Sequence, residues 1–458
     1  MLMMPPAQPR NAKNFWHSRR NKRMQSPIFP AIHIPHLEQV TLPPVHRVRL
    51  THPRGTPVAD LSQTVTAALE ASQKFSTLPA GATVAIAVGS RGIARISDVV
   101  ALSVQWLKGR GFRPFIVPAM GSHGGARAED QAQILRDFNI REEVVGAPIR
   151  ATMEVVEYGT VAQGIACKFD REAAAADAVL VINRVKSHTS FDRPIESGLV
   201  KMVAVGLGKA EGARNVHKIG PRGLAEVLPE LARLAIAKSP ISYGLALVEN
   251  GDKELILVEG VEPEQFFESD ERLLQVAKTY LAKLPFDQLD VLIVQEIGKD
   301  ISGMGMDYAV IGRTDIRGIP NPPTPFIHKI GALSVTPESH GNAQGIGMAD
   351  FIPLSVTHAI DLEALYINAL TASVVEKTRI PPVLPDDRAV LRACVATCWR
   401  LDEAQARLCI IRSTLHLTEI LASSSLLPEL EGWEGVEVLS PPLPIEFSEE
   451  GTLLTRCP

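Results

Sequence analysis

The sequence predicts an α/β protein of two domains, each with a largely parallel sheet flanked by helices. Short apolar, β-branched runs alternate with helical patterns along much of the chain, which is typical of this class. At 458 residues, with 45% hydrophobic and 21% charged content, the chain is long enough for two separate cores. A new buried-strand pattern begins at Leu289 after a long helical stretch, and we expect it to open the second domain.

The first domain is expected over residues 27–285. After a Pro-rich approach, strand patterns at 82–89 and 114–121 are each followed by a helical pattern, at 96–111 and 126–140. The remaining patterns are strands at 177–185 and 243–250 and a helix at 269–284. Because strand and helix alternate, the sheet of this domain is expected to be largely parallel.

The second domain is expected over residues 286–445. Its predicted elements are strands at 289–298 and 406–414 and helices at 361–372 and 386–401. Residues 299–358 are rich in Gly and Pro and predict long loops, which are usually functional or disordered. Residues 446–458 are expected to form a poorly ordered tail.

Charge and composition exclude several classes of function. The net charge of −4 provides no global basic field that would attract nucleic-acid phosphates. The sequence also contains no run of eighteen apolar residues, which a membrane-spanning helix would need. The five cysteines are odd in number and scattered, which indicates a reducing compartment and therefore the cytoplasm.

The first 26 residues differ in charge from the rest of the chain. They hold six Lys or Arg and no acid, and they lack the apolar core of a signal peptide. A transit peptide or a polyanion-binding arm would fit this composition. We favour a disordered basic extension without function, or a chain whose real start is Met24.

Four predicted strands lead directly into polar side chains: Arg91, His123, His188 and Lys299. In open α/β sheets, ligands bind in the crevice beyond the carboxyl ends of the strands. We therefore expect these residues to share an active site in the cleft between the two domains.

Each of these four positions also has a structural explanation. Ser90 and Ser122 would cap following helices, Gly-rich turns serve tight connections, and a lone histidine is often a hydrogen-bonded structural residue. Capping does not, however, require imidazole, guanidinium and ammonium groups at four equivalent places.

The side chains at these positions suit a small carboxylic acid as substrate. Arg91 and Lys299 can hold a carboxylate by charge-assisted hydrogen bonds, and His123 and His188 can act as acid and base near neutral pH. Two acid–base groups are what a racemase or epimerase needs, because its stereocentre must be served from both faces.

Short motifs surround these residues and two others. His123 stands in "GSH", His188 in "KSH", Lys201 in "SGLVK" and His217 in "RNVH", sixteen residues after Lys201. Over about residues 89–299 these motifs resemble the nickel-dependent lactate racemase family, hydroxyacid racemases and epimerases that use a nickel-pincer nucleotide.

The resemblance implies a role for each residue. His123 and His188 would be the catalytic acid–base pair, Lys201 would join the cofactor covalently, and His217 would ligate Ni(II) in a roughly square-planar site. An apolar setting suits such a lysine, because burial favours the neutral, nucleophilic amine. By the same comparison, Ser187 and Gly198 would contact the cofactor, and Arg91 and Lys299 would bind the substrate.

The resemblance also implies a mechanism and partners. One histidine would take the hydroxyl proton while the α-hydrogen moves as hydride to the pyridinium ring, giving a 2-keto acid that is reduced again on the other face. The partners would be a small 2-hydroxy acid and the enzymes that synthesise the pincer. His340, Asn342 and Asp350 are further candidates for the cleft.

Some positions depart from the lactate racemases of that family. This chain has Val88-Gly89-Ser90-Arg91 where they have Asp-Gly-Thr-Arg, and Leu199-Val200 before the lysine where they have Gly-Arg. The gap from His188 to Lys201 is also longer. The sequence therefore indicates a divergent member whose substrate, lactate-like or a sugar acid, is open.

Two other functions fit the same residues. One is a redox or lyase reaction on a hydroxy or sugar acid at the same site. The other is a carboxylate- or phosphate-binding protein without catalysis, in which "GSHGG" is an anion-binding turn. Binding alone would not require His123, His188, Lys201 and His217 together.

Overall fold

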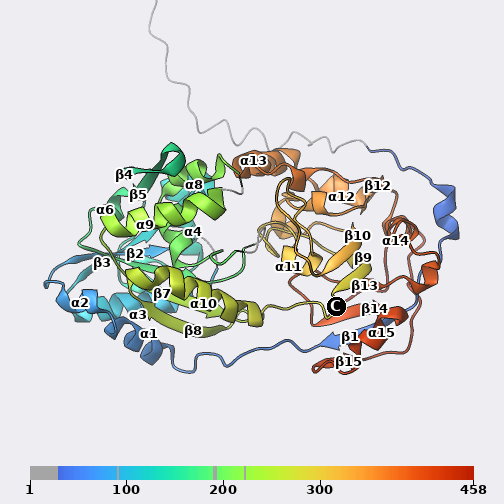
Figure 1. Cartoon of the computed structure of the whole chain (residues 1–458), viewed down its shortest axis with the longest axis horizontal. Helices are drawn as coiled ribbons and strands as arrows, with labels where there is room; N and C mark the ends of the chain where they lie inside the picture. The colour runs from blue at the N-terminus through green and yellow to red at the C-terminus, as the bar shows by residue number, and fades with distance from the viewer. Residues whose placement is uncertain (1–28, 90–91, 189–192, 221–222) are drawn as a thin grey trace, which may run out of the picture.

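Two lobes, each built around one sheet, make up the described part of the chain (Figure 1). The structure is a computed structural model that describes residues 29–89, 92–188, 193–220 and 223–458. The described chain starts in the second lobe at residue 29, crosses to the first lobe after Leu50, and returns after Thr279 (Figure 1). In the described ranges, no helix is long and apolar enough to cross a membrane.

The first lobe contains a five-stranded sheet in the order β3-β2-β6-β7-β8. The strands are β2 (Thr83–Val88), β3 (Arg113–Pro118), β6 (Ala178–Arg184), β7 (Ile241–Glu249) and β8 (Leu255–Val261). All neighbours are parallel except β7 and β8, which are antiparallel. A separate antiparallel hairpin, β4 (Val155–Val161) and β5 (Ile165–Asp170), lies beside α8 and α9. The predicted parallel sheet is confirmed here.

Helices cover both faces of this sheet. They are α1 (Leu61–Glu70), α2 (Gln73–Thr77), α3 (Ile96–Gly109), α4 (Ala128–Asp137), α5 (Glu142–Val145), α6 (Arg171–Ala174), α7 (Leu199–Lys201), α8 (Lys209–His217), α9 (Leu228–Lys238) and α10 (Phe266–Thr279). Side chains alternate across a strand, so Ile86 of β2 packs in the cluster with α1 and α3, and Ala87 in the cluster with α7, α9 and α10. The sheet is therefore the middle of three layers.

The second lobe contains a mixed sheet in the order β10-β9-β13-β14-β1-β15. The strands are β1 (Val45–Leu50), β9 (Gln288–Val294), β10 (Phe326–Ala332), β13 (Leu408–Ile411), β14 (Glu419–Ser423) and β15 (Val436–Val438). Pairing is parallel among β10, β9 and β13 and antiparallel from β13 to β15. The expected parallel arrangement thus holds for one half of this sheet.

Short helices and a small two-stranded sheet complete the second lobe. The helices are α11 (Tyr308–Ile311), α12 (Leu354–Ala359), α13 (Leu362–Ala372), α14 (Asp387–Ala396) and α15 (Leu427–Leu430), and the small sheet pairs β11 (Ile352–Pro353) with β12 (Val383–Leu384). We expected only loops over 299–358, but this range contains β10. A lysine and a histidine interrupt the apolar run of β10, which hides the strand pattern.

Both ends of the described chain pack into the second lobe, unlike the predicted organisation. β1 lies within the range assigned to the first domain, yet it pairs with β14 and β15 of the second sheet. The segment 446–458, expected to be a loose tail, buries Leu453 and Cys457, and the backbone of Cys457 exchanges hydrogen bonds with the Gln295 side chain. Its apolar side chains fill a cluster that the sheet alone leaves open.

The placement of β1 generates a stability prediction. Val48 is fully buried between β14 and β15, so Val48→Ala is expected to lower the free energy of unfolding by about 1–3 kcal/mol. Arg49, the next residue, is exposed and forms a surface ion pair with Glu437. Arg49→Ala should therefore change the free energy of unfolding by less than about 0.5 kcal/mol. Urea denaturation measures both. Equal effects would contradict the burial of β1 in this sheet.

Candidate functional site

Three strands of the first sheet end side by side at the predicted site. Val88 at the end of β2 is level with Pro118 of β3 and Ile182 of β6. The segments that follow these strands therefore leave the same edge of the sheet, as expected from the sequence.

The loop after β6 carries Ser187 and His188 and is held by a buried carboxylate. Glu196, 2% exposed, accepts hydrogen bonds from the backbone N–H of His188 (2.6 Å) and of Arg193 (3.2 Å) and pairs with Lys278 of α10 at 2.7 Å. This anchor closes the loop and fixes the backbone position of His188.

His188 lies close to Lys201 and His217. Burial lowers the pKa of His188 well below its ordinary value, and the positive charges of Lys201, Lys377 and Lys186 lower it further. Burial and the charge of Lys201 likewise lower the pKa of His217. The structure thus brings these three predicted residues together with both imidazoles in the neutral form.

Lys201 and His217 stand at two points of one helical segment. Lys201 is the last residue of α7, a π-helical turn follows over Met202–Gly206, and His217 is the last residue of α8. π-Helical turns are rare and are frequently found at functional sites. This turn sets the orientation of α8 relative to α7.

The turn that carries His123 packs against that π-helical turn. The N–H of Gly121 donates to the carbonyl of Gly206 at 3.1 Å, and a Cβ on Gly206 would collide with the carbonyl oxygen of Ala119. Gln131 of α4 donates to the carbonyls of Gly121 (3.0 Å) and His123 (3.1 Å). The backbone of the turn is therefore fixed, while the His123 side chain is exposed.

A buried ion pair connects α8 to the same turn. Lys209, the first residue of α8, is fully buried and pairs with Asp170 of β5 at 2.8 Å. Its Nζ also donates to the carbonyl of Pro118 at 2.5 Å and to Gln131 at 3.4 Å. Removing one partner of such a buried pair typically costs about 3–5 kcal/mol. The sequence did not reveal this pair. A lysine at the start of a helix ordinarily indicates a solvent-exposed surface, so neither Lys209 nor its partner Asp170 was predicted to be buried.

The charges around His188 are mainly positive and come from both lobes. Lys377, from a short 3₁₀ turn after α13, is fully buried, and burial lowers its pKa to about 7 against the opposing charges of Asp307 and Asp315. Burial raises the pKa of Asp307, and the positive charges of Lys186 and Lys377 partly offset this increase. A buried region with more cations than carboxylates is suited to an anionic ligand.

The two predicted substrate-binding residues have different outcomes. Arg91 lies outside the described residues. Lys299 follows β9, and its Nζ donates to Asn368 of α13 at 2.7 Å, while its backbone N–H donates to Ser339 at 2.8 Å.

The further candidates in the second lobe have local structural roles. Asp350 binds Arg313 at 2.9 Å and the N–H of Ile330 at 2.7 Å, which fixes β10. Asn342 accepts a hydrogen bond from the N–H of Gln344 within its own turn, and His340 is exposed.

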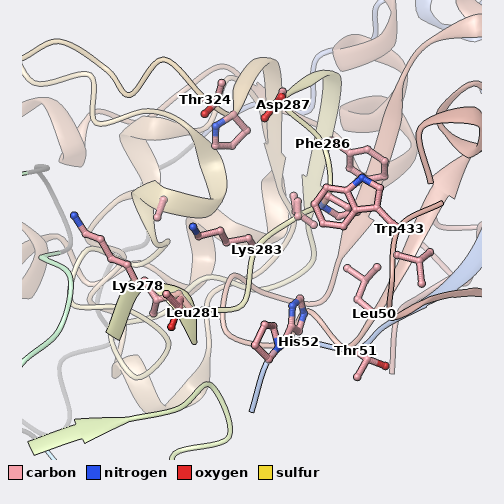
Figure 2. Close-up of a pocket in the computed structure, with 18 of the residues that line it drawn as sticks. Leu50, Thr51, His52, Lys278, Leu281, Lys283, Phe286, Asp287, Thr324 and Trp433 are labelled. Atoms are coloured by element: carbon pink, nitrogen blue, oxygen red, sulfur yellow. The ribbon is translucent and has the colours of Figure 1, made fainter. Parts of the chain in front are cut away.

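A cavity of about 800 Å³ borders the His188 loop (Figure 2). Lys278 lies at one side and Trp433 at the other, and both segments that cross between the lobes contribute to its wall (Figure 2). Ser187 also lines it, and this buried hydroxyl has no hydrogen-bond partner among the described residues. Ser187 can therefore bind a ligand that enters from this side.

The donors near Lys201 fit a cofactor that brings most of its own metal ligands. In the described ranges, no group of three or more His, Cys, Asp or Glu side chains could hold a metal ion. His217 offers one neutral imidazole, the form that ligates a metal. This donor set agrees with a metal held mainly by an organic cofactor and by one histidine.

Gly198, predicted to contact the cofactor, is already in contact with protein. A Cβ at this position would overlap the carboxylate of Asp270, a buried residue of α10. The glycine is needed for that close approach. Asp270 was missed because it lies in an amphipathic helical pattern, where an acid ordinarily faces solvent.

Comparison with known proteins supports the architecture of both lobes. The lactate racemase apoprotein from Thermoanaerobacterium thermosaccharolyticum superposes with a TM-score of 0.51 and 12% sequence identity, covering 81% of this chain and 99% of that chain. This similarity shows a shared α/β fold. No curated protein sequence matches the chain.

One family model matches the part of the chain that carries His123, His188, Lys201 and His217. It describes the lactate racemase N-terminal domain, and it matches residues 36–220. Residues 36–220 are therefore similar to the lactate racemase N-terminal domain.

Proposed function

We propose that this protein is a nickel-pincer-dependent racemase or epimerase of a 2-hydroxy acid. The observation that carries the proposal is the convergence of His188, Lys201 and His217 within the domain that matches the family, where Lys201 lies close enough to lower the pKa of both histidines. A purely structural cluster would not place two neutral imidazoles beside a lysine.

Lys201 and His217 are the residues that would hold the cofactor. The Lys201 amine would attach to its thiocarboxyl group, and the neutral His217 imidazole would ligate Ni(II). When bound, the pincer nucleotide supplies acceptance and return of a hydride. Ser187 would hydrogen-bond the bound ligand, because its buried hydroxyl lines the adjoining cavity.

His188 and His123 would move the substrate's hydroxyl proton. His188 is suited to accept it, because its lowered pKa keeps the imidazole neutral at neutral pH. His123, on the rigid turn after β3, would serve the opposite face of the stereocentre. Lys377 and Lys186 would attract the substrate carboxylate, together with Lys299 of the second lobe.

Two alternatives remain distinguishable. A redox or lyase reaction at the same site would accumulate a keto acid or an eliminated product without a racemised one. A binding protein without catalysis would take up the acid and return it with its configuration unchanged.

A panel of chiral 2-hydroxy acids and sugar acids tests the function directly. Holoprotein co-produced with the pincer-synthesis enzymes is expected to racemise at least one of them. His123→Ala and His188→Ala should each lower kcat by at least about 10²-fold, because a positioned acid or base contributes about that factor. Chiral chromatography of the products is the measurement. Full activity in either variant would remove that histidine from the mechanism.

Lys377 generates a prediction about pH dependence. A base with a low pKa stays neutral until the pH falls through that pKa. In Lys377→Met one positive charge near His188 is gone, while Lys201 and Lys186 stay, so the pKa of His188 rises. The acidic limb of the kcat/KM profile should therefore move to higher pH.

Lys329→Met is the matched control for this variant. Lys329 lies in β10 of the same lobe, where its charge acts on His328 and Cys394. The acidic limb of the kcat/KM profile of Lys329→Met should coincide with that of the wild type. An unchanged limb in Lys377→Met would show that this lysine does not act on the base.

A further inference from the structure

The N-terminus of the turn that carries Lys201 is capped by a distant acid. Asp270 of α10 accepts hydrogen bonds from the N–H of Leu199 (Oδ1, 3.0 Å) and of Val200 (Oδ2, 2.8 Å). Both carboxylate oxygens are used, and Asp270 is 1% exposed. The acid lies 70 residues beyond the backbone that it caps.

The residues around this contact allow little movement. Gly198 leaves room for the carboxylate, which a Cβ would occupy, and its carbonyl accepts a hydrogen bond from Asn183 of β6 at 2.6 Å. The backbone before Lys201 is thus fixed to both β6 and α10. Lys201 follows Val200 directly.

The backbone after Lys201 is fixed as well. The π-helical turn ends at Gly206, whose carbonyl accepts the N–H of Gly121 from the His123 turn. The Lys201 side chain therefore projects from a short segment held at both ends. Its direction depends on the Asp270 contact at one end and on the His123 turn at the other.

A solvent-exposed capping carboxylate would hold the start of a helix without the free-energy cost of burying a charge. Asp60 caps α1 with one hydrogen bond from an exposed position. Burial raises the pKa of Asp270 to about 7, although the two N–H groups favour the charged form. Burying a carboxylate is unfavourable, so this contact contributes more to position than to stability.

We propose that Asp270 is a positioning residue that directs the Lys201 amine toward the cofactor during covalent attachment. The inference rests on the proposed function. In the attachment, Nζ forms a bond to the thiocarboxyl carbon and the oxygen of that group leaves as water. The water takes one proton from the amine and one from the thiocarboxyl group, and nothing is oxidised or reduced.

Asp270→Asn in the full chain tests this role. Asn has nearly the same volume but places an NH₂ group against one of the two N–H donors. When the variant is co-produced with the pincer-synthesis enzymes, the fraction of Lys201 that carries the adduct should fall about 10- to 100-fold by intact mass. Activity per mole of adduct and the KM should stay at wild-type values, which a general loss of structure would not give.

Asp386→Asn is the matched control. Asp386 caps α14 in the second lobe through the N–H of Ala389 (2.8 Å), and Gly451 packs against its carboxylate as Gly198 does against Asp270. Its adduct fraction should equal that of the wild type. A wild-type adduct fraction in Asp270→Asn, or the same loss in Asp386→Asn, would overturn the inference.

A second measurement separates this inference from the proposed function. Competitive acetylation of the apoprotein with acetic anhydride should show a severalfold change in the reactivity of Lys201 relative to the exposed Lys74 in Asp270→Asn. Gly198→Ala, which displaces the carboxylate by its Cβ, should give the same change if Asp270→Asn does not fold. If the reactivity of Lys201 in Asp270→Asn equals that of the wild type, Asp270 does not position the amine. If the wild-type protein carries no adduct, only the proposal that it binds the pincer cofactor is refuted.

Discussion

The buried ion pair of Lys209 and Asp170 is the contact on which the arrangement of the first lobe's site depends. It holds the start of α8 against the end of β3, so the helix that ends in His217 and the turn that carries His123 keep a fixed relation. Gln131 extends the same network to the backbone of that turn. If one partner were removed, the other would remain as an unpaired buried charge, and α8 would lose its fixed position relative to the sheet.

Two carboxylates organise the rest of the site from α10 and the His188 loop. Glu196 binds the backbone N–H groups of His188 and Arg193 and pairs with Lys278 of α10, and Asp270 caps the turn before Lys201. Both acids are buried and both bind backbone N–H groups. They therefore fix the main chain around Lys201, His188 and His217, the side chains to which the proposed function assigns the chemistry.

The positive charge of the site has a chemical consequence. Lys186 and Lys201 from the first lobe and Lys377 from the second act on His188, and burial adds to their effect. An anionic substrate that enters between them is attracted by the cations, and a neutral imidazole is available to take its proton. Under the proposed function, carboxylate binding and base catalysis would both follow from this electrostatic arrangement.

The sequence predicts those parts of the molecule that depend on local pattern. Apolar runs followed by glycine located the ends of β2 and β3. The pairing of β1 with β14, and the contacts of Lys209 and Asp270, depend on residues far apart in the chain. A buried lysine or acid in a helix has the same local pattern as a solvated one, so only the packed structure reveals it.

Native mass spectrometry of holoprotein co-produced with the pincer-synthesis enzymes tests whether Lys201 and His217 hold the cofactor. We expect nickel and a covalent adduct on Lys201 in the wild type, the adduct without nickel in His217→Ala, and neither in Lys201→Ala. Racemase activity from a protein whose Lys201 is unmodified would contradict this expectation.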